Sequence, residues 1–349
     1  MRFLSGTSYL PIGVDIGGRC IKAVQLRGGP GRWCVTAAGS IVRDNPGGPV
    51  ESADIVQLRE LMSKGAFKGR RVVLAVPFTQ LLSGIMELPP RSSGAPLEEL
   101  ARSELSRMHR CEPDSFEIAC WDLPAPARAG GATYVMAAGF RHEHAEELVD
   151  VVEAEGLDVY ALDIHASAVS RVCSPLLEGV TGIAAILDLG WDQADLVLLY
   201  QGVVVYERKL VKCGISSLVD SLSRELKLHH KKAEELVRKV GLSAECPGVT
   251  PASVRAVNLG VNSYCEDLVE EMRIPLSYLA NQYPDAPPET LLLIGGGGRI
   301  PGLEGQLDSV LDFYVRTVLP GDIVKCSPDI ERQFGPSLTM AAGLGQFSE

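Results

Sequence analysis

The stretch IGVDIGGRCIKAVQL (residues 12–26) reads as a strand, a glycine turn and a second strand. Two short apolar runs flank Asp15, Gly17 and Gly18, where the chain has to reverse its direction. A carboxylate at a strand end beside such a turn can hold hydrated Mg²⁺ while backbone N–H groups face phosphate oxygens. Lys22 can supply a cation for the same phosphates. A tight hairpin with an exposed Asp15 and Lys22 is the alternative interpretation.

The pattern returns about 170 residues later in LDLGWDQADL (residues 187–196). Asp188 and Gly190 again follow an apolar strand, and further strands are expected around the turn at Gln201–Gly202. Either hairpin alone would be unremarkable in a protein of this size. Their recurrence indicates that the two halves of the chain share one plan.

A third segment, LIGGGGRIPGL (residues 293–303), takes a buried strand into four glycines and then toward a helix near Pro301. Glycines at such a point allow the close approach of a planar ring or a phosphate. The alternative is a strand–helix turn that needs positive φ angles. Four consecutive glycines are more than that turn requires.

Composition limits the function classes. The 349 residues suggest about two domains, and 44 acidic against 33 basic residues give a net charge of −11. This charge argues against a nucleic-acid partner, because phosphate binding needs a basic face. We expect a cytoplasmic chain, because no apolar run approaches a membrane span and Met1 to Pro11 has no signal-peptide pattern. The 9 cysteines contain no CxxC pair, so reduced thiols are expected and a zinc site is not.

Together, the two Asp-x-Gly hairpins and the later glycine turn resemble the actin-like ATPase superfamily, in which two related lobes clamp a nucleotide. The closer resemblance is to the PilM family of type IV pilus assembly proteins, which are relatives of FtsA. It covers nearly the whole chain. The segments that carry it are residues 12–26, RRVVLAVP (70–77) through VVEAEGL (151–157), LDIHASAVSR (162–171), YERKLVKCGISSL (206–218), KKAEELVRKVGL (231–242) and LLLIGGGGRIPGLEGQL (291–307).

The resemblance implies an α/β fold of the actin-like (ribonuclease H-like) type. Two lobes would hold duplicated mixed sheets, and a small α+β subdomain would be inserted in the first lobe. The expected divisions are 1–70 for the first-lobe core, 71–156 for the inserted subdomain, 157–180 for the rest of the first-lobe core, 181–335 for the second lobe with a helical subdomain at about 215–285, and 336–349 for a C-terminal helix that returns to the first lobe.

The same resemblance implies a site for ATP or ADP with Mg²⁺. Asp15 would lie near the metal, with Lys22, Gly17, Gly18 and Arg19 at the phosphates. Asp188 and Gly190 would face the phosphates from the second lobe. The adenosine would lie against Gly295, Gly296 and Gly297. Glu234 and Arg238 would lie at the edge of its adenine ring.

The chain departs from the family pattern where phosphates would bind. The first turn has Gly18-Arg19-Cys20 in place of hydroxyl residues, and the second has Trp191, with Ala194 where Thr is common. Two interpretations stay open: a nucleotide that acts as a structural ligand with slow or no hydrolysis, or a site that has decayed. Arg19 would grip a phosphate in the first case and fill the site in the second. The sequence offers no catalytic residue to position water.

In function, the resemblance implies a cytoplasmic scaffold peripheral to the inner membrane, with no direct membrane insertion. It would bind the cytoplasmic tail of a PilN-like bitopic protein in a groove between the first-lobe core and the inserted block, and link it to motor ATPases. Three alternatives remain. They are the cytoplasmic part of a GspL-type secretion protein, an FtsA-like division protein, and a small-molecule kinase for which Asp163 is the only candidate carboxylate.

Overall fold

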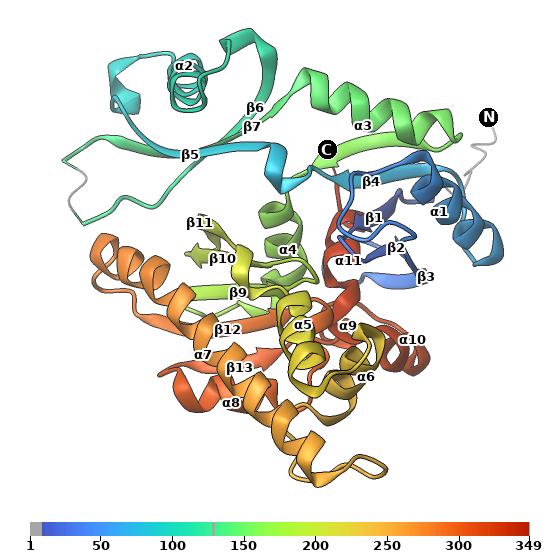
Figure 1. Ribbon diagram of the computed structural model, residues 1–349. Coiled ribbons are helices and arrows are strands. Elements are labelled where there is room, and N and C mark those ends of the chain that lie inside the picture. Colours follow the sequence, from blue (N-terminus) through green and yellow to red (C-terminus); the bar gives the residue numbers. More distant parts are fainter. Residues whose placement is uncertain (1–8, 128–129, 349) are drawn as a thin grey trace.

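Two five-stranded sheets with the same strand order form the frame of the molecule (Figure 1). The first runs β3-β2-β1-β4-β8 and the second β11-β10-β9-β12-β13. In each sheet, three successive strands pair antiparallel through hairpins, and two later strands add in parallel beside the first of them. The predicted duplication of mixed sheets in a two-lobed α/β fold is therefore confirmed.

The structure, a computed structural model, describes residues 9–127 and 130–348. The first eight residues, most of the stretch in which no signal peptide is expected, lie outside the described part, as do 128, 129 and 349. The first sheet contains β1 (Ile12–Ile16), β2 (Cys20–Arg27), β3 (Cys34–Val42), β4 (Arg71–Ala75) and β8 (Asp158–Asp163). The second contains β9 (Ile183–Leu189), β10 (Ala194–Tyr200), β11 (Val203–Leu210), β12 (Pro288–Ile294) and β13 (Tyr314–Thr317).

The inserted subdomain is smaller than the sequence boundaries 71–156 imply. Its three-stranded sheet has the order β5-β7-β6 and comprises β5 (Leu81–Leu88), β6 (Phe116–Asp122) and β7 (Thr133–Arg141), with helix α2 (Leu97–His109) packed on it. Strand β4 instead pairs with β1 and β8, and Leu148 and Val152 of α3 (His142–Ala154) pack into the first-lobe core. Both elements therefore belong to the first lobe, which corrects the predicted boundaries.

Helices cover the faces of the two sheets. The first lobe has α1 (Ser52–Lys64), α3, α4 (His165–Cys173) and α11 (Thr339–Gly345). The second lobe has α5 (Ile215–Leu226), α6 (His230–Val240), α7 (Pro251–Gln282), α8 (Leu303–Val310), α9 (Pro320–Ile323) and α10 (Pro328–Phe334). No helix in the described ranges is long and apolar enough to cross a membrane.

The C-terminal segment closes the core of the first lobe. The C-terminal segment expected to form one helix over 336–349 is divided into a 3₁₀ turn, Gly335–Leu338, and the shorter α11, which corrects the prediction. All seven residues of α11 are buried, and the helix packs against β1, β2 and α4. Glycine permits this approach, because a Cβ on Gly13 would lie 2.1 Å from the carbonyl oxygen of Ala341.

The inserted subdomain also contacts the second lobe. The indole Nε1 of Trp121 in β6 donates to the carbonyl of Val204 in β11 at 2.9 Å. Near the end of α7, the Tyr283 hydroxyl donates to the carbonyl of Pro124 at 2.9 Å. The insertion, which is joined to the first lobe, therefore also packs against β11 and the end of α7 in the second lobe (Figure 1).

The α11 contact yields a stability prediction. Gly13→Ala places a methyl group against backbone atoms that have no room to yield, so we expect a loss of about 3 kcal/mol or more in the free energy of unfolding, measured in urea. Gly305→Ala in α8 is the matched control. A Cβ there meets nothing within 4 Å, and alanine favours the helix. Equal effects of the two substitutions would contradict the packing described.

Candidate functional site

A cavity of about 1290 Å³ lies between the two lobes. Its walls include both Asp-x-Gly hairpins and the turn that follows β12. Every residue that the sequence nominates for the site lines this one cavity. These residues are Asp15, Gly17, Gly18, Arg19, Lys22, Asp188, Gly190, Glu234, Arg238, Gly295, Gly296 and Gly297.

Asp15 and Lys22 form an ion pair at the end of the β1–β2 hairpin. They face each other across the antiparallel pair, with Lys22 Nζ 2.6 Å from Asp15 Oδ2, and each side chain is 18% exposed. Burial alone would lower the pKa of Lys22, but Asp15, helped by Asp188, raises it above its ordinary value. Lys22 therefore stays charged, and the groups expected at Mg²⁺ and phosphate are already paired with each other.

A histidine that sequence reasoning missed pairs with the second carboxylate. His165 begins α4, directly after β8 of the first lobe, and its Nε2 lies 3.0 Å from Asp188 Oδ2. Burial alone would lower the pKa of His165, but the hydrogen bond to Asp188 and the charges of Asp195 and Glu207 raise it to about 9. His165 is therefore a cation at neutral pH and connects the two lobes.

Arg19 reaches across the cleft from the first lobe to the second. Its Nη2 lies 2.6 Å from Glu234 Oε2 of α6, and its guanidinium carbon lies 4.2 Å from the ring centroid of Trp191. Both contacts restrain a side chain with several rotatable bonds. Glu234, predicted to edge an adenine, is engaged by Arg19 in this arrangement.

Asp192 is a second residue that the sequence analysis did not single out. It stands in the bend between β9 and β10, and its carboxylate lies directly against the first-lobe glycine turn. A Cβ on Gly18 would be 1.5 Å from Asp192 Oδ2, and one on Gly47 would be 3.7 Å from Oδ1. A side chain at position 18 would displace this carboxylate from its present position.

The four glycines after β12 have different roles. Gly295 has a φ of 80°, and a Cβ there would lie 2.2 Å from Asp188 Oδ1. A Cβ on Gly297 would meet Leu189 and Ile215, so this glycine serves packing. Gly296 has open space above it, with nothing within 4 Å of the Cβ position. Of the four, Gly296 therefore offers the backbone surface that a planar ligand could approach.

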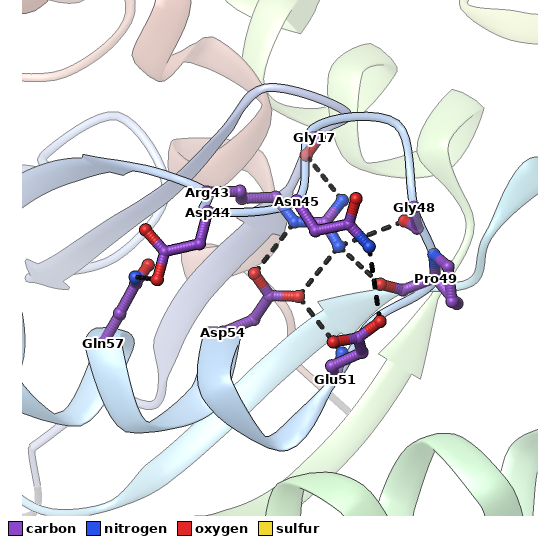
Figure 2. Close-up of polar contacts among 9 residues, drawn as sticks. All are labelled: Gly17, Arg43, Asp44, Asn45, Gly48, Pro49, Glu51, Asp54 and Gln57. Atoms are coloured by element: carbon purple, nitrogen blue, oxygen red, sulfur yellow. Dashed lines mark hydrogen bonds and ion pairs between the residues drawn. The ribbon is translucent and has the colours of Figure 1, made fainter.

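A buried arginine supports the first glycine turn (Figure 2). Arg43 and Asp54 are each 4% exposed, and the guanidinium donates to both carboxylate oxygens at 3.0 and 2.8 Å. Arg43 also donates to the carbonyls of Gly48 and Pro49. Its backbone N–H donates to the carbonyl of Arg19 at 2.9 Å. Burial raises the pKa of Asp54, but hydrogen bonds from Arg43 and the backbone of Glu51 outweigh it and lower the pKa.

Comparison with known proteins assigns this chain to a family. Residues 13–346 match the family model described as type IV pilus assembly protein PilM. The chain belongs to this family. A comparison with curated proteins found no match.

Solved structures share the actin-like fold that was predicted. The PilM-PilN type IV pilus biogenesis complex has a TM-score of 0.76 and 23% identity, over 97% of this chain and 99% of that one. Ethanolamine utilization protein EutJ from Carboxydothermus hydrogenoformans has a TM-score of 0.57 and 15% identity, over 97% and 90%. MreB5 of Spiroplasma citri bound to ADP has a TM-score of 0.54 and 12% identity, over 96% and 95%.

Asp163 is the candidate carboxylate for the alternative function as a small-molecule kinase. In the structure, both of its carboxylate oxygens already accept hydrogen bonds within the protein. Its Oδ1 accepts from the backbone N–H of Ile164 at 2.7 Å, and its Oδ2 accepts from Arg171 at 2.9 Å. The side chain is 7% exposed. It does not line the cavity, and Ile164 rather than Asp163 is the N-cap of α4, so Asp163 anchors Arg171 and the backbone where β8 leads into α4.

The Arg43 pair yields a testable prediction. Arg43→Met leaves the Asp54 carboxylate buried without its cationic partner and should cost about 3–5 kcal/mol of unfolding free energy in urea. Adding Asp54→Leu removes the remaining charge and should recover most of this loss. Lys64→Met, which breaks an exposed pair with Glu60, should cost less than about 1 kcal/mol. A double variant no more stable than Arg43→Met would contradict the account.

The His165–Asp188 pair predicts a pH dependence. Because the folded-state pKa of His165 is raised to about 9 from an ordinary value near 6.5, its stabilisation is complete below pH 6.5 and is lost as pH rises to 9. We expect the native protein to lose up to about 3 kcal/mol of unfolding free energy across this range. His165→Gln should flatten the profile, whereas His142→Gln on the surface should not. An unchanged profile in His165→Gln would refute the assignment.

Proposed function

We propose that this PilM-family chain is a cytoplasmic scaffold of a type IV pilus or type II secretion assembly complex at the inner membrane. It holds the cytoplasmic tail of a PilN-like membrane partner and couples it to cytoplasmic motor ATPases. The observation that carries the proposal is the family match over residues 13–346. The relative solved as a PilM-PilN complex supports the choice of partner.

The tail would bind where the first-lobe core meets the inserted subdomain. The lining of the interlobe cavity includes the segment between β4 and β5 and helix α3. The wall is partly apolar and partly polar, which suits a short segment held by a few side chains. The lining residues from these two parts of the chain are Val76, Pro77, Thr79, Gln80, His144, Glu147, Leu148 and Val151.

The cleft would take ATP or ADP with Mg²⁺ as a second, structural ligand. The described residues hold no group of three or more His, Cys, Asp or Glu that could bind a metal on its own. Mg²⁺ commonly uses one or two carboxylates together with substrate phosphates, so Asp15 fits that role. Lys22, Gly17 and Gly18 would face the phosphates from the first lobe. Since Lys22 now neutralises Asp15, a bound metal would require that pair to rearrange.

Further contacts complete the proposed nucleotide site. Asp188 and Gly190 would face the phosphates from the second lobe, and Gly295, Gly296 and Gly297 would lie near the nucleoside. We assign no catalytic residue, and we expect hydrolysis to be weak or absent. The bound nucleotide would then stabilise the association of the lobes and would not be turned over.

The scaffold proposal predicts specific capture of a membrane partner's tail. A peptide with the sequence of the cytoplasmic tail of a PilN-like partner should bind the purified protein in a titration followed by fluorescence anisotropy. Thr79→Arg puts a bulky cation into the groove and should weaken binding by about tenfold or more.

Ser103→Arg is the matched control, because it places the same side chain on the exposed face of α2, away from the cavity. It should bind the peptide like the native protein. Equal affinities of native protein, Thr79→Arg and Ser103→Arg would remove the groove assignment. Absence of binding by all three would sink the proposed partner.

A further inference from the structure

We propose that Asp192 acts as a built-in anion in the first glycine turn and so determines which ligands the cleft accepts. The inference rests on the nucleotide site proposed above. Asp192 is not one of the residues that the hairpin motifs indicate. From the neighbouring sequence alone, it would be taken for an ordinary aspartate in a turn.

Both partners in this contact are held in place. The carbonyls of Gly190 and Trp191 accept from the backbone N–H groups of Ile215 and Ser216 at 3.1 and 2.9 Å, which fixes the Asp192 bend on the start of α5. On the opposite lobe, the backbone N–H of Gly47 donates to the carbonyl of Gly18 at 2.7 Å. The carboxylate therefore rests against a turn that has little freedom to withdraw.

The contact places negative charge where a phosphate would have to bind. A carboxylate and a phosphate are both anionic acceptors, so they compete for the same backbone and the same space. A Cβ built on Gly18 would nearly coincide with Asp192 Oδ2, which shows how completely the carboxylate fills that position. A phosphate that approached Gly18 from the side of its Cβ position would have to displace Asp192.

Three of the cations that line the cavity do not offset this exclusion, because each of them already has an anionic partner in the chain. Arg19 pairs with Glu234, Lys22 with Asp15, and His165 with Asp188. A phosphate chain would have to break at least one of these pairs as well as displace Asp192. The cleft consequently disfavours ligands more strongly as more of their phosphates reach the turn.

Calorimetric titration of the full chain with ATP and with AMP, each with Mg²⁺, tests the inference. The native protein should bind AMP at least as tightly as ATP. Asp192→Ala should shift the ratio of the two dissociation constants by about tenfold or more in favour of ATP, through tighter ATP binding. Asp192→Asn, which keeps the size and removes the charge, should produce a smaller shift in the same direction. Asp312→Asn, an exposed acid remote from the cavity, should leave the ratio unchanged.

Three results would overturn the inference. They are a native protein that prefers ATP by a wide margin, an unchanged ratio in Asp192→Ala, and no binding of either nucleotide to Asp192→Ala at concentrations on the order of 1 mM. Titration of the same variants with the partner-tail peptide separates this outcome from failure of the proposed function. If the tail peptide binds and the ratio of the ATP and AMP dissociation constants does not change, only the proposed role of Asp192 is refuted.

Discussion

Charges enclosed between two protein lobes are costly unless they are neutralised, and this constraint explains three ion pairs in the cleft. Lys22 neutralises Asp15, His165 neutralises Asp188, and Arg19 neutralises Glu234. The last two pairs join different parts of the chain across the opening. The same charges that would serve a nucleotide thus hold the lobes together in its absence. Any ligand must exchange its own charges for these pairs, so its affinity depends on a difference between two sets of interactions.

The fold could be predicted where its signals are local. An Asp-x-Gly turn between apolar runs identifies a hairpin without knowledge of the rest of the chain, and two such turns reveal the duplication. Strand β4 was harder to place, since five residues with an apolar centre fit either the first sheet or the inserted one. Pairing with β1 decides between them, and that contact is invisible in the sequence of β4 alone. The division of the C-terminal segment into a 3₁₀ turn and α11 likewise carries no signal in the local sequence.

The residues of the site also differ in whether a local sequence signal identifies them. Asp15, Lys22 and Asp188 stand in recognisable motifs, and the structure brings them to one cavity. His165, Asp192 and the Arg43–Asp54 pair carry no such signal, because their importance comes from neighbours supplied by other elements. Arg19 and Glu234 are separated by 215 positions in the chain, yet their side chains meet. Sequence reasoning identified Arg19 as an anomaly in the turn and could not tell whether it would meet a phosphate or a carboxylate.

The burial of α11 in the first lobe has a consequence for biosynthesis. Strands β1 and β2 are made early, but the helix that covers them is encoded more than 300 residues later. While the ribosome is still producing the second lobe, the nascent first lobe keeps an apolar surface open to solvent. Its final structure must therefore form late in translation, and until then the emerging chain presents a natural target for chaperones.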